Sequence, residues 1–254
     1  MSSPPIVFIH GMFMTPKCWA SWVTRFEEAG HTCHTPAFPF HHGRPDLLRQ
    51  QPDEQLGQLK LSDVEQRIAE TVDKLPVKPI LVGHSMGGLI AQRLVAAGKA
   101  SAAVCISSAP PSGVSCIAAS FIRCNAPIVN PFRLNTPFLP TKTWFRYAFA
   151  HTMSQAASDR VFDEQVVPES RNIPRNTQNE GRIDFRAAHP PLLFIAGQRD
   201  HLFPAGLNRK NAAKYRHTDS RVDFHQFDDR THLLCMQDGW EAVADHVLEW
   251  IKTV

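Results

Sequence analysis

The chain of 254 residues is long enough for one large hydrophobic core, and a composition of 43% hydrophobic and 20% charged residues excludes disordered and fibrous classes. Its 27 basic residues nearly balance 24 acidic ones without a cluster of like charges, which argues against nucleic-acid and membrane partners. No apolar stretch reaches the roughly 18 residues of a spanning helix, and residues 1–5 show no signal-like leader. We therefore expect a cytoplasmic protein without membrane insertion that acts on a small molecule, in an oligomeric state that the sequence leaves open.

Short apolar runs alternate with helical patterns along the chain, which favours a mostly parallel sheet covered on both faces. The sequence thus predicts an α/β fold with about six strands and helices on both sides. The expected strands are Ile6–His10, Thr32–Pro36, Ile80–Gly83, Ala102–Ser107, Leu192–Gly197 and Val222–Phe227.

Three helices have clear start signals. The first is predicted from Thr15 as N-cap and Pro16 at the first helical position, and it ends before a glycine. A capping box of Ser62 and Glu65 predicts the second, and Asp238 followed by Glu241 predicts the last. Apolar residues at helical spacing give each of them one buried face.

Two regions interrupt the alternation of strands and helices. Residues 37–61 are rich in Pro, Gly, Gln and His, which predicts a long loop. Residues 111–188 combine broken helical patterns, many prolines and many aromatic residues, which predicts a helical cap inserted into the sheet domain. The expected organisation is a core of residues 1–110 and 189–254 with this cap above it.

The cysteine and histidine patterns predict neither disulfides nor a metal site. The six cysteines are scattered without a Cys-x-x-Cys pair, so we expect reduced thiols, mostly in the core. The histidines at positions 31, 34, 41 and 42 lack accompanying carboxylates and a regular helical spacing, which argues against metal binding. We also expect no cofactor.

The motif Gly-x-Ser-x-Gly stands at residues 83–87, after a predicted strand and before a predicted helix. In this context the backbone turns sharply at Ser85 and raises its hydroxyl above the sheet. Small residues at Gly83 and Gly87 let the strand and the helix approach each other closely. Unpaired N–H groups at the start of the helix favour negative charge on a substrate oxygen beside Ser85.

A serine hydroxyl needs a base within reach, and that base needs an orienting group. Asp200 follows the predicted strand 192–197, so we expect it at the carboxyl edge of the sheet, where α/β folds place their sites. His232 lies in the loop after the last predicted strand. The alternatives are Asp228 and Asp229 for the acid, and His225 and His201 for the base, whereas His10 and His84 are expected to be structural.

The order Ser85, Asp200, His232 resembles that of the α/β-hydrolase superfamily, and the resemblance covers essentially the whole chain. His10-Gly11 with Trp19, and Gly197 with Asp200 and Pro204, look like further segments of that family. The resemblance implies that the backbone N–H groups of Met12 and Met86 form an oxyanion hole, with Phe13 as the alternative first donor. This chain departs from the family in two places. The sheet is expected to be smaller, without the usual N-terminal hairpin, and Thr231 stands before His232 where a glycine is frequent.

The reaction expected from this resemblance is hydrolysis of carboxylic esters with small to medium apolar acyl groups, through an acyl-enzyme on Ser85. A lyase or carbon–carbon bond hydrolase with the same three residues is the alternative, followed by a ligand receptor without catalysis. Aromatic residues of the expected cap, with one from the first loop, are predicted to line the substrate pocket: Phe13, Phe121, Phe138, Trp144 and Phe149.

Overall fold

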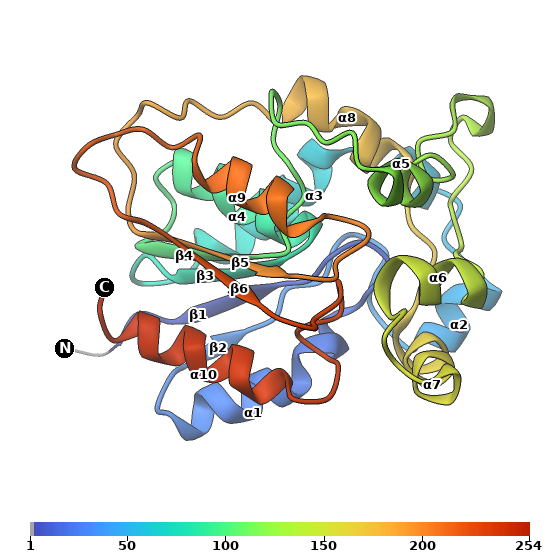
Figure 1. Ribbon diagram of the computed structural model, residues 1–254, viewed down its shortest axis with the longest axis horizontal. Coiled ribbons are helices and arrows are strands. Elements are labelled where there is room, and N and C mark those ends of the chain that lie inside the picture. Colours follow the sequence, from blue (N-terminus) through green and yellow to red (C-terminus); the bar gives the residue numbers. More distant parts are fainter. Residues whose placement is uncertain (1–2) are drawn as a thin grey trace.

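Six parallel strands run through the centre of the molecule in the computed structural model, which describes residues 3–254 (Figure 1). Their order is β2-β1-β3-β4-β5-β6, and every neighbouring pair is parallel. The predicted α/β fold class is confirmed, and each expected strand is present within a few residues. The strands are β1 (Ile6–Ile9), β2 (Cys33–His34), β3 (Ile80–His84), β4 (Ala102–Ile106), β5 (Leu192–Gly197) and β6 (Val222–Phe227).

The central strands are buried on both faces because their side chains alternate between two hydrophobic clusters. In β1, Ile6 and Phe8 face one cluster while Val7 and Ile9 face the other. Strands β3, β4 and β5 alternate in the same way. Burial on both faces therefore explains why these strands are nearly continuous apolar runs rather than alternating polar and apolar residues.

Helices cover both faces of the sheet (Figure 1). The 3-10 turn η1 (Pro16–Trp19), α1 (Ala20–Glu28) and α10 (Trp240–Ile251) pack on one face. The other face is covered by α3 (Leu61–Val72), α4 (Met86–Ala96) and α9 (Ala205–Ala212).

The helices begin differently from the sequence prediction. The Thr15 side chain makes no capping hydrogen bond, although Pro16 does open η1 as expected. Helix α3 starts at Leu61, where the Lys60 N–H donates to Asp63 at 2.8 Å, so the predicted box of Ser62 and Glu65 is wrong. Helix α10 follows a glycine with a φ of 79° and is not capped by Asp238. The Asp63 carboxylate and a left-handed glycine thus stand at the starts of α3 and α10, in place of the side chains that the sequence suggested.

The region predicted as one long loop contains two short helical segments. These are α2 (Pro45–Gln50) and the 3-10 turn η2 (Leu56–Gln58), so the loop prediction is wrong for about a third of residues 37–61. A proline at the first position of α2 explains its start.

The segment between β4 and β5 contains five short helical segments joined by irregular stretches. Its helices α5, α6 and α7 gather at one end of the sheet, with α2 beside α7 (Figure 1). Within residues 3–254, no helix has the length and apolarity needed to cross a bilayer. The segment contains α5 (Ala119–Asn125), η3 (Pro131–Arg133), α6 (Lys142–Phe149), α7 (Gln155–Gln165) and α8 (Asn172–Glu180).

Candidate active site

Ser85 occupies the single-residue turn between β3 and α4. Its φ of 58° and ψ of −119° lie in a region that side chains other than glycine rarely adopt. The turn requires glycine on both sides, since a Cβ atom at Gly83 would lie 2.1 Å from the Gly87 carbonyl oxygen. A Cβ atom at Gly87 would lie 2.2 Å from the Ile9 carbonyl oxygen. Close approach of strand and helix thus holds the serine in its strained conformation.

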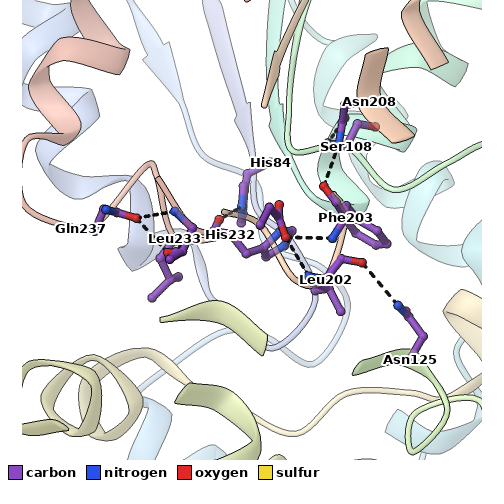
Figure 2. Close-up of polar contacts among 11 residues, drawn as sticks. His84, Ser108, Asn125, Leu202, Phe203, Asn208, His232, Leu233 and Gln237 are labelled. Carbon is purple, nitrogen blue, oxygen red and sulfur yellow. Dashed lines mark hydrogen bonds and ion pairs between the residues drawn. The ribbon is translucent and has the colours of Figure 1, made fainter. Parts of the chain in front are cut away.

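Asp200 and His232 meet at the carboxyl edge of the sheet. Their Oδ2 and Nδ1 atoms lie 2.7 Å apart, and both side chains are buried. The second carboxylate oxygen of Asp200 accepts hydrogen bonds from the N–H groups of Leu202 and Phe203, each at 2.8 Å (Figure 2). Three donors therefore fix the orientation of this carboxylate.

The rival acids do not reach His232. Asp229 is an exposed residue 3.7 Å from Arg199, and Asp228 accepts a hydrogen bond from Gln226. Asp200 is thus the carboxylate that orients the His232 ring.

A glycine brings the two loops of this pair together. A Cβ atom at Gly197 would lie 2.5 Å from the Arg230 carbonyl oxygen and 2.7 Å from that of Thr231. The loop of His232 is also fixed from its other side, because Gln237 accepts hydrogen bonds from both the N–H and the hydroxyl of Thr231 (Figure 2). The hydroxyl bond of Thr231 is one that a glycine at this position could not make.

His84 connects the serine turn to the histidine loop. Its Nε2–H donates to the His232 carbonyl oxygen at 2.8 Å, and the two rings lie 4.7 Å apart (Figure 2). Burial, and then the nearby His232 ring, lower the pKa of His84 to about 3, so it is neutral at physiological pH. The role is structural, as expected, but His84 positions the neighbouring loop as well as the turn.

The side chains of His10, His201 and His225 make contacts other than the one between His232 and Asp200. The Nδ1–H of His10 donates to the Gly11 carbonyl oxygen, while its Nε2 accepts from the Phe38 N–H at 3.1 Å. Burial lowers the pKa of His10 to about 3. His201 bonds the Tyr147 carbonyl oxygen, and His225 stacks on His246. Among residues 3–254, His232 is the histidine whose ring bonds Asp200.

The second ring nitrogen of His232 is free to act as a base. Because Nδ1–H faces Asp200, Nε2 carries the lone pair, and it is buried without a hydrogen-bond partner among residues 3–254. No hydrogen bond joins it to the Ser85 hydroxyl in this arrangement. The structure joins Asp200 to His232 and holds His232 against the serine turn through His84. The catalytic roles of the three residues stay a prediction.

Two backbone N–H groups beside Ser85 are available to a ligand. Within residues 3–254, neither the Met12 nor the Met86 N–H donates to another protein atom. A Cβ atom at Gly11 would lie 2.8 Å from Ser85 Cβ and 3.3 Å from its hydroxyl oxygen, so this loop passes directly against the serine. Phe13, the alternative donor, has a φ of 68°, and its N–H also has no partner in that range.

Aromatic rings enclose His232. The Phe149 ring lies edge-on 4.8 Å from that of His232, and Phe203 lies 5.4 Å from it on another side. The predicted pocket residues extend these contacts, because Phe13, Trp144 and Phe138 form one cluster with Phe149, while Phe121 contacts Phe203.

Phe203 was absent from the sequence prediction, although its place three residues after Asp200 could have suggested it.

Two backbone hydrogen bonds attach the segment between β4 and β5, which carries most of the aromatic rings near His232, to other parts of the chain. The Phe149 carbonyl oxygen accepts from the Leu233 N–H, and that of Phe13 accepts from Val167.

The described residues contain neither a cluster of metal ligands nor a disulfide. Residues 3–254 contain no group of three or more His, Cys, Asp or Glu side chains that could hold a metal ion. The six cysteines are free thiols. Burial raises the pKa of the Cys124 thiol to about 12, and burial likewise raises that of Cys105, which keeps both protonated.

Comparison with known proteins gives one family and one fold. The alpha/beta hydrolase family matches residues 6–246. Among solved structures, a monoacylglycerol lipase of Paleococcus ferrophilus superposes with a TM-score of 0.72 at 18% identity, over 98% of this chain and 95% of that one. A methylesterase from Arabidopsis gives 0.70 at 14% identity, over 99% and 100%. Tomato methylketone synthase I gives 0.73 at 17%, over 100% and 99%. The search of curated proteins finds no match.

Proposed function

Because this chain belongs to the alpha/beta hydrolase family, we propose that it is a serine hydrolase that cleaves carboxylic esters with small to medium apolar acyl groups. The observation that carries the proposal is the buried pair of Asp200 and His232 beside a strained serine turn. Among residues 3–254, Nε2 of His232 has no hydrogen-bond partner. A base oriented in this way is what a serine nucleophile requires.

In the proposed reaction, His232 acts first as a base and then as an acid. Nε2 of His232 takes the proton of Ser85, whose oxygen attacks the acyl carbonyl carbon. The N–H groups of Met12 and Met86 stabilise the negative oxygen, and Asp200 keeps the ring in the correct tautomer and stabilises its charge. The alcohol leaves with the proton from His232. A water molecule, activated by the same nitrogen, then releases the acid from Ser85.

The proposed substrate class follows from the side chains around His232. The segment 111–188 acts in this account as a cap over the core of residues 1–110 and 189–254. Its rings, with Phe203 of the core, present apolar surface to the site, which suits an acyl chain better than a charged group. Only 5% of Ser85 is exposed, so the serine lies beneath the surrounding side chains.

The solved structures agree with an ester substrate without fixing it. Two of the three are named for ester cleavage, a lipase and a methylesterase, whereas the third is named a synthase. At identities below 20% they share the fold, and one fold hosts several reactions. A direct assay has to decide between them.

The test is a substrate panel given to the wild type, Ser85→Ala and the control Ser115→Ala, which removes an exposed hydroxyl. The panel holds 4-nitrophenyl esters from acetate to octanoate, a hydroxynitrile and a diketone. We expect ester cleavage with the wild type and the control, and a loss of about 10³-fold or more with Ser85→Ala. Ester cleavage that survives in Ser85→Ala would contradict the proposal, and turnover of the hydroxynitrile or diketone alone would favour the alternative reaction.

A further inference from the structure

A cavity whose lining contains neither Ser85 nor His232 lies in the segment between β4 and β5. It has a volume of about 530 Å³, which is within the usual range of small-molecule sites. Helices α5, α6 and α7 contribute its walls, and Figure 1 shows these helices together beyond the end of the sheet. The lining residues are Arg123, Lys142, Thr143, Arg146, Tyr147, His151, Gln155 and Asp159.

The charge of this cavity is predominantly positive. Three permanent cations face one carboxylate, Asp159. Lys142 already pairs with Asp163 at 2.7 Å, whereas Arg123 and Arg146 make no ion pair or hydrogen bond through their side chains in the described part of the chain. The local sequence explains this imbalance, because residues 74–158 contain no Asp or Glu. Two guanidinium groups are thus left without anionic partners.

The Arg123 guanidinium is held by an aromatic contact. The guanidinium carbon of Arg123 lies 4.0 Å from the centre of the Tyr147 ring, a cation–π contact that orients it. Arg146 is half-buried on α6, one residue before Tyr147. The Tyr147 ring also packs 4.7 Å from His201, which stacks on His151 at 3.6 Å. The cavity therefore has a packed aromatic floor beneath its cations.

The cavity is separate from the candidate active site. At 100° per residue, Thr143, Arg146 and Tyr147 lie on one face of α6. The opposite face carries Phe145 and Phe149, which are buried and stack on each other. Because Phe149 packs on His232, helix α6 stands between the two sites.

We propose that this cavity binds a small organic anion, with its carboxylate or phosphate group between Arg123 and Arg146. Guanidinium groups recognise both kinds of oxygen acceptors, and their hydrogen bonds to anions are stronger than those between neutral groups. The Thr143 hydroxyl and the Gln155 amide lie in the same lining and supply neutral donors. The body of the ligand packs on the Tyr147 side of the cavity.

Isothermal titration calorimetry of the full chain tests the proposal. The probes are phenyl phosphate and benzoate, with benzyl alcohol as the uncharged control. We expect saturable binding of at least one anion at one site per chain, and none of benzyl alcohol. A tighter complex with phenyl phosphate identifies a phosphorylated ligand, and a tighter complex with benzoate identifies a carboxylate. Absence of saturable anion binding, or equal binding of the alcohol, overturns the proposal.

Variants place the binding in this cavity. Arg146→Gln and Arg123→Gln are each expected to weaken it at least about tenfold. Arg146→Lys, which keeps the charge but loses the planar fork, should fall between the wild type and Arg146→Gln. The matched control is Arg133→Gln, which removes an exposed arginine of the same segment outside the cavity and should bind as the wild type does. Circular dichroism checks that the variants fold, and wild-type affinity in Arg146→Gln overturns the assignment.

Discussion

The orientation of the His232 ring depends on a single carboxylate. Asp200 accepts the Nδ1–H of His232 together with two backbone N–H groups, so neither the carboxylate nor the ring can rotate freely. This arrangement selects the tautomer that leaves Nε2 unprotonated. The proposed chemistry rests on that tautomer, because only an unprotonated Nε2 can accept the proton of Ser85.

Replacing the carboxylate of Asp200 by an amide tests this dependence. In Asp200→Asn the amide can donate to Nδ1, which favours the wrong tautomer, and we expect kcat for ester hydrolysis to fall by about 10³–10⁴-fold. The control is Asp229→Asn, whose side chain is 86% exposed and should leave kcat unchanged. Steady-state kinetics on a 4-nitrophenyl ester measures both. Near-wild-type kcat in Asp200→Asn would assign the orienting role to another group.

Gly197 allows the loops of Asp200 and His232 to touch. In Gly197→Ala the new methyl group would meet two backbone carbonyl oxygens, so the loops must separate. Because misplacement by about 1 Å costs on the order of 10²-fold in rate, we expect a loss of that size in kcat. Gly206→Ala is the matched control, since a Cβ atom there meets nothing within 4 Å. Unchanged kcat in Gly197→Ala would show that the loops tolerate the displacement.

Among the secondary-structure elements, the segment between β4 and β5 is tied to the core by a buried ion pair. His41, in the loop before α2, lies 3.1 Å from Glu169, which precedes α8, and both side chains are almost fully buried. The Nδ1–H of His41 donates to the Pro39 carbonyl oxygen. Glu169 also pairs through its backbone with Phe138, one of the rings near the site. The pair thus connects the first long loop to the aromatic cluster.

Removing one partner of this pair is expected to destabilise the fold. Burial alone would lower the pKa of His41, but the Glu169 carboxylate and hydrogen bonds outweigh it and raise the pKa. In Glu169→Gln the His41 ring loses its buried carboxylate partner and deprotonates more readily, so we expect the free energy of unfolding to fall by about 1–3 kcal/mol. Chemical denaturation measures this cost. Glu249→Gln, which breaks an exposed pair with Lys252, should stay within about 0.5 kcal/mol of the wild type.

The same pair has a pH signature. A raised pKa means that its stabilisation is complete below pH 6.5 and is lost as the pH rises through the raised value. The wild type should therefore lose stability above pH 6.5 relative to Glu169→Gln, whose dependence in that range should be flatter. Parallel curves for the two proteins would contradict a charged His41.

For the whole molecule, we expect a marked loss of stability in mild acid. Burial lowers the pKa of His10 and His84 to about 3 in the folded state, so the unfolded chain binds protons from pH 6.5 downwards while the folded chain does not. Each residue then contributes a loss of up to about 1.4 kcal/mol per pH unit between pH 6.5 and 3. Urea denaturation at pH 7.5, 5.5 and 4.5 measures the decline, and a constant midpoint would contradict two buried neutral histidines.

The architecture could be predicted from sequence far better than the conformation of the segment between β4 and β5. Strands buried on both faces are recognised by continuous apolar runs, such as residues 192–197. The serine turn is recognised by the glycines on either side of Ser85. Helix starts were less predictable, because the Asp63 carboxylate at α3 and a left-handed glycine at α10 replaced the expected caps. The contact of Phe203 with His232, and that of His41 with Glu169, join residues far apart in the chain, which no local pattern encodes.

Covalent labelling of Ser85 is the most direct test of the proposed chemistry. A fluorophosphonate reacts much faster with a serine that a base activates and an oxyanion hole accommodates than with an ordinary serine. We expect one adduct per chain, mapped by mass spectrometry to the peptide of Ser85, no adduct in Ser85→Ala, and strongly slowed labelling in Asp200→Asn. A wild-type chain that stays unlabelled while folded, or an adduct on a different serine, would contradict the assignment of Ser85 as the nucleophile.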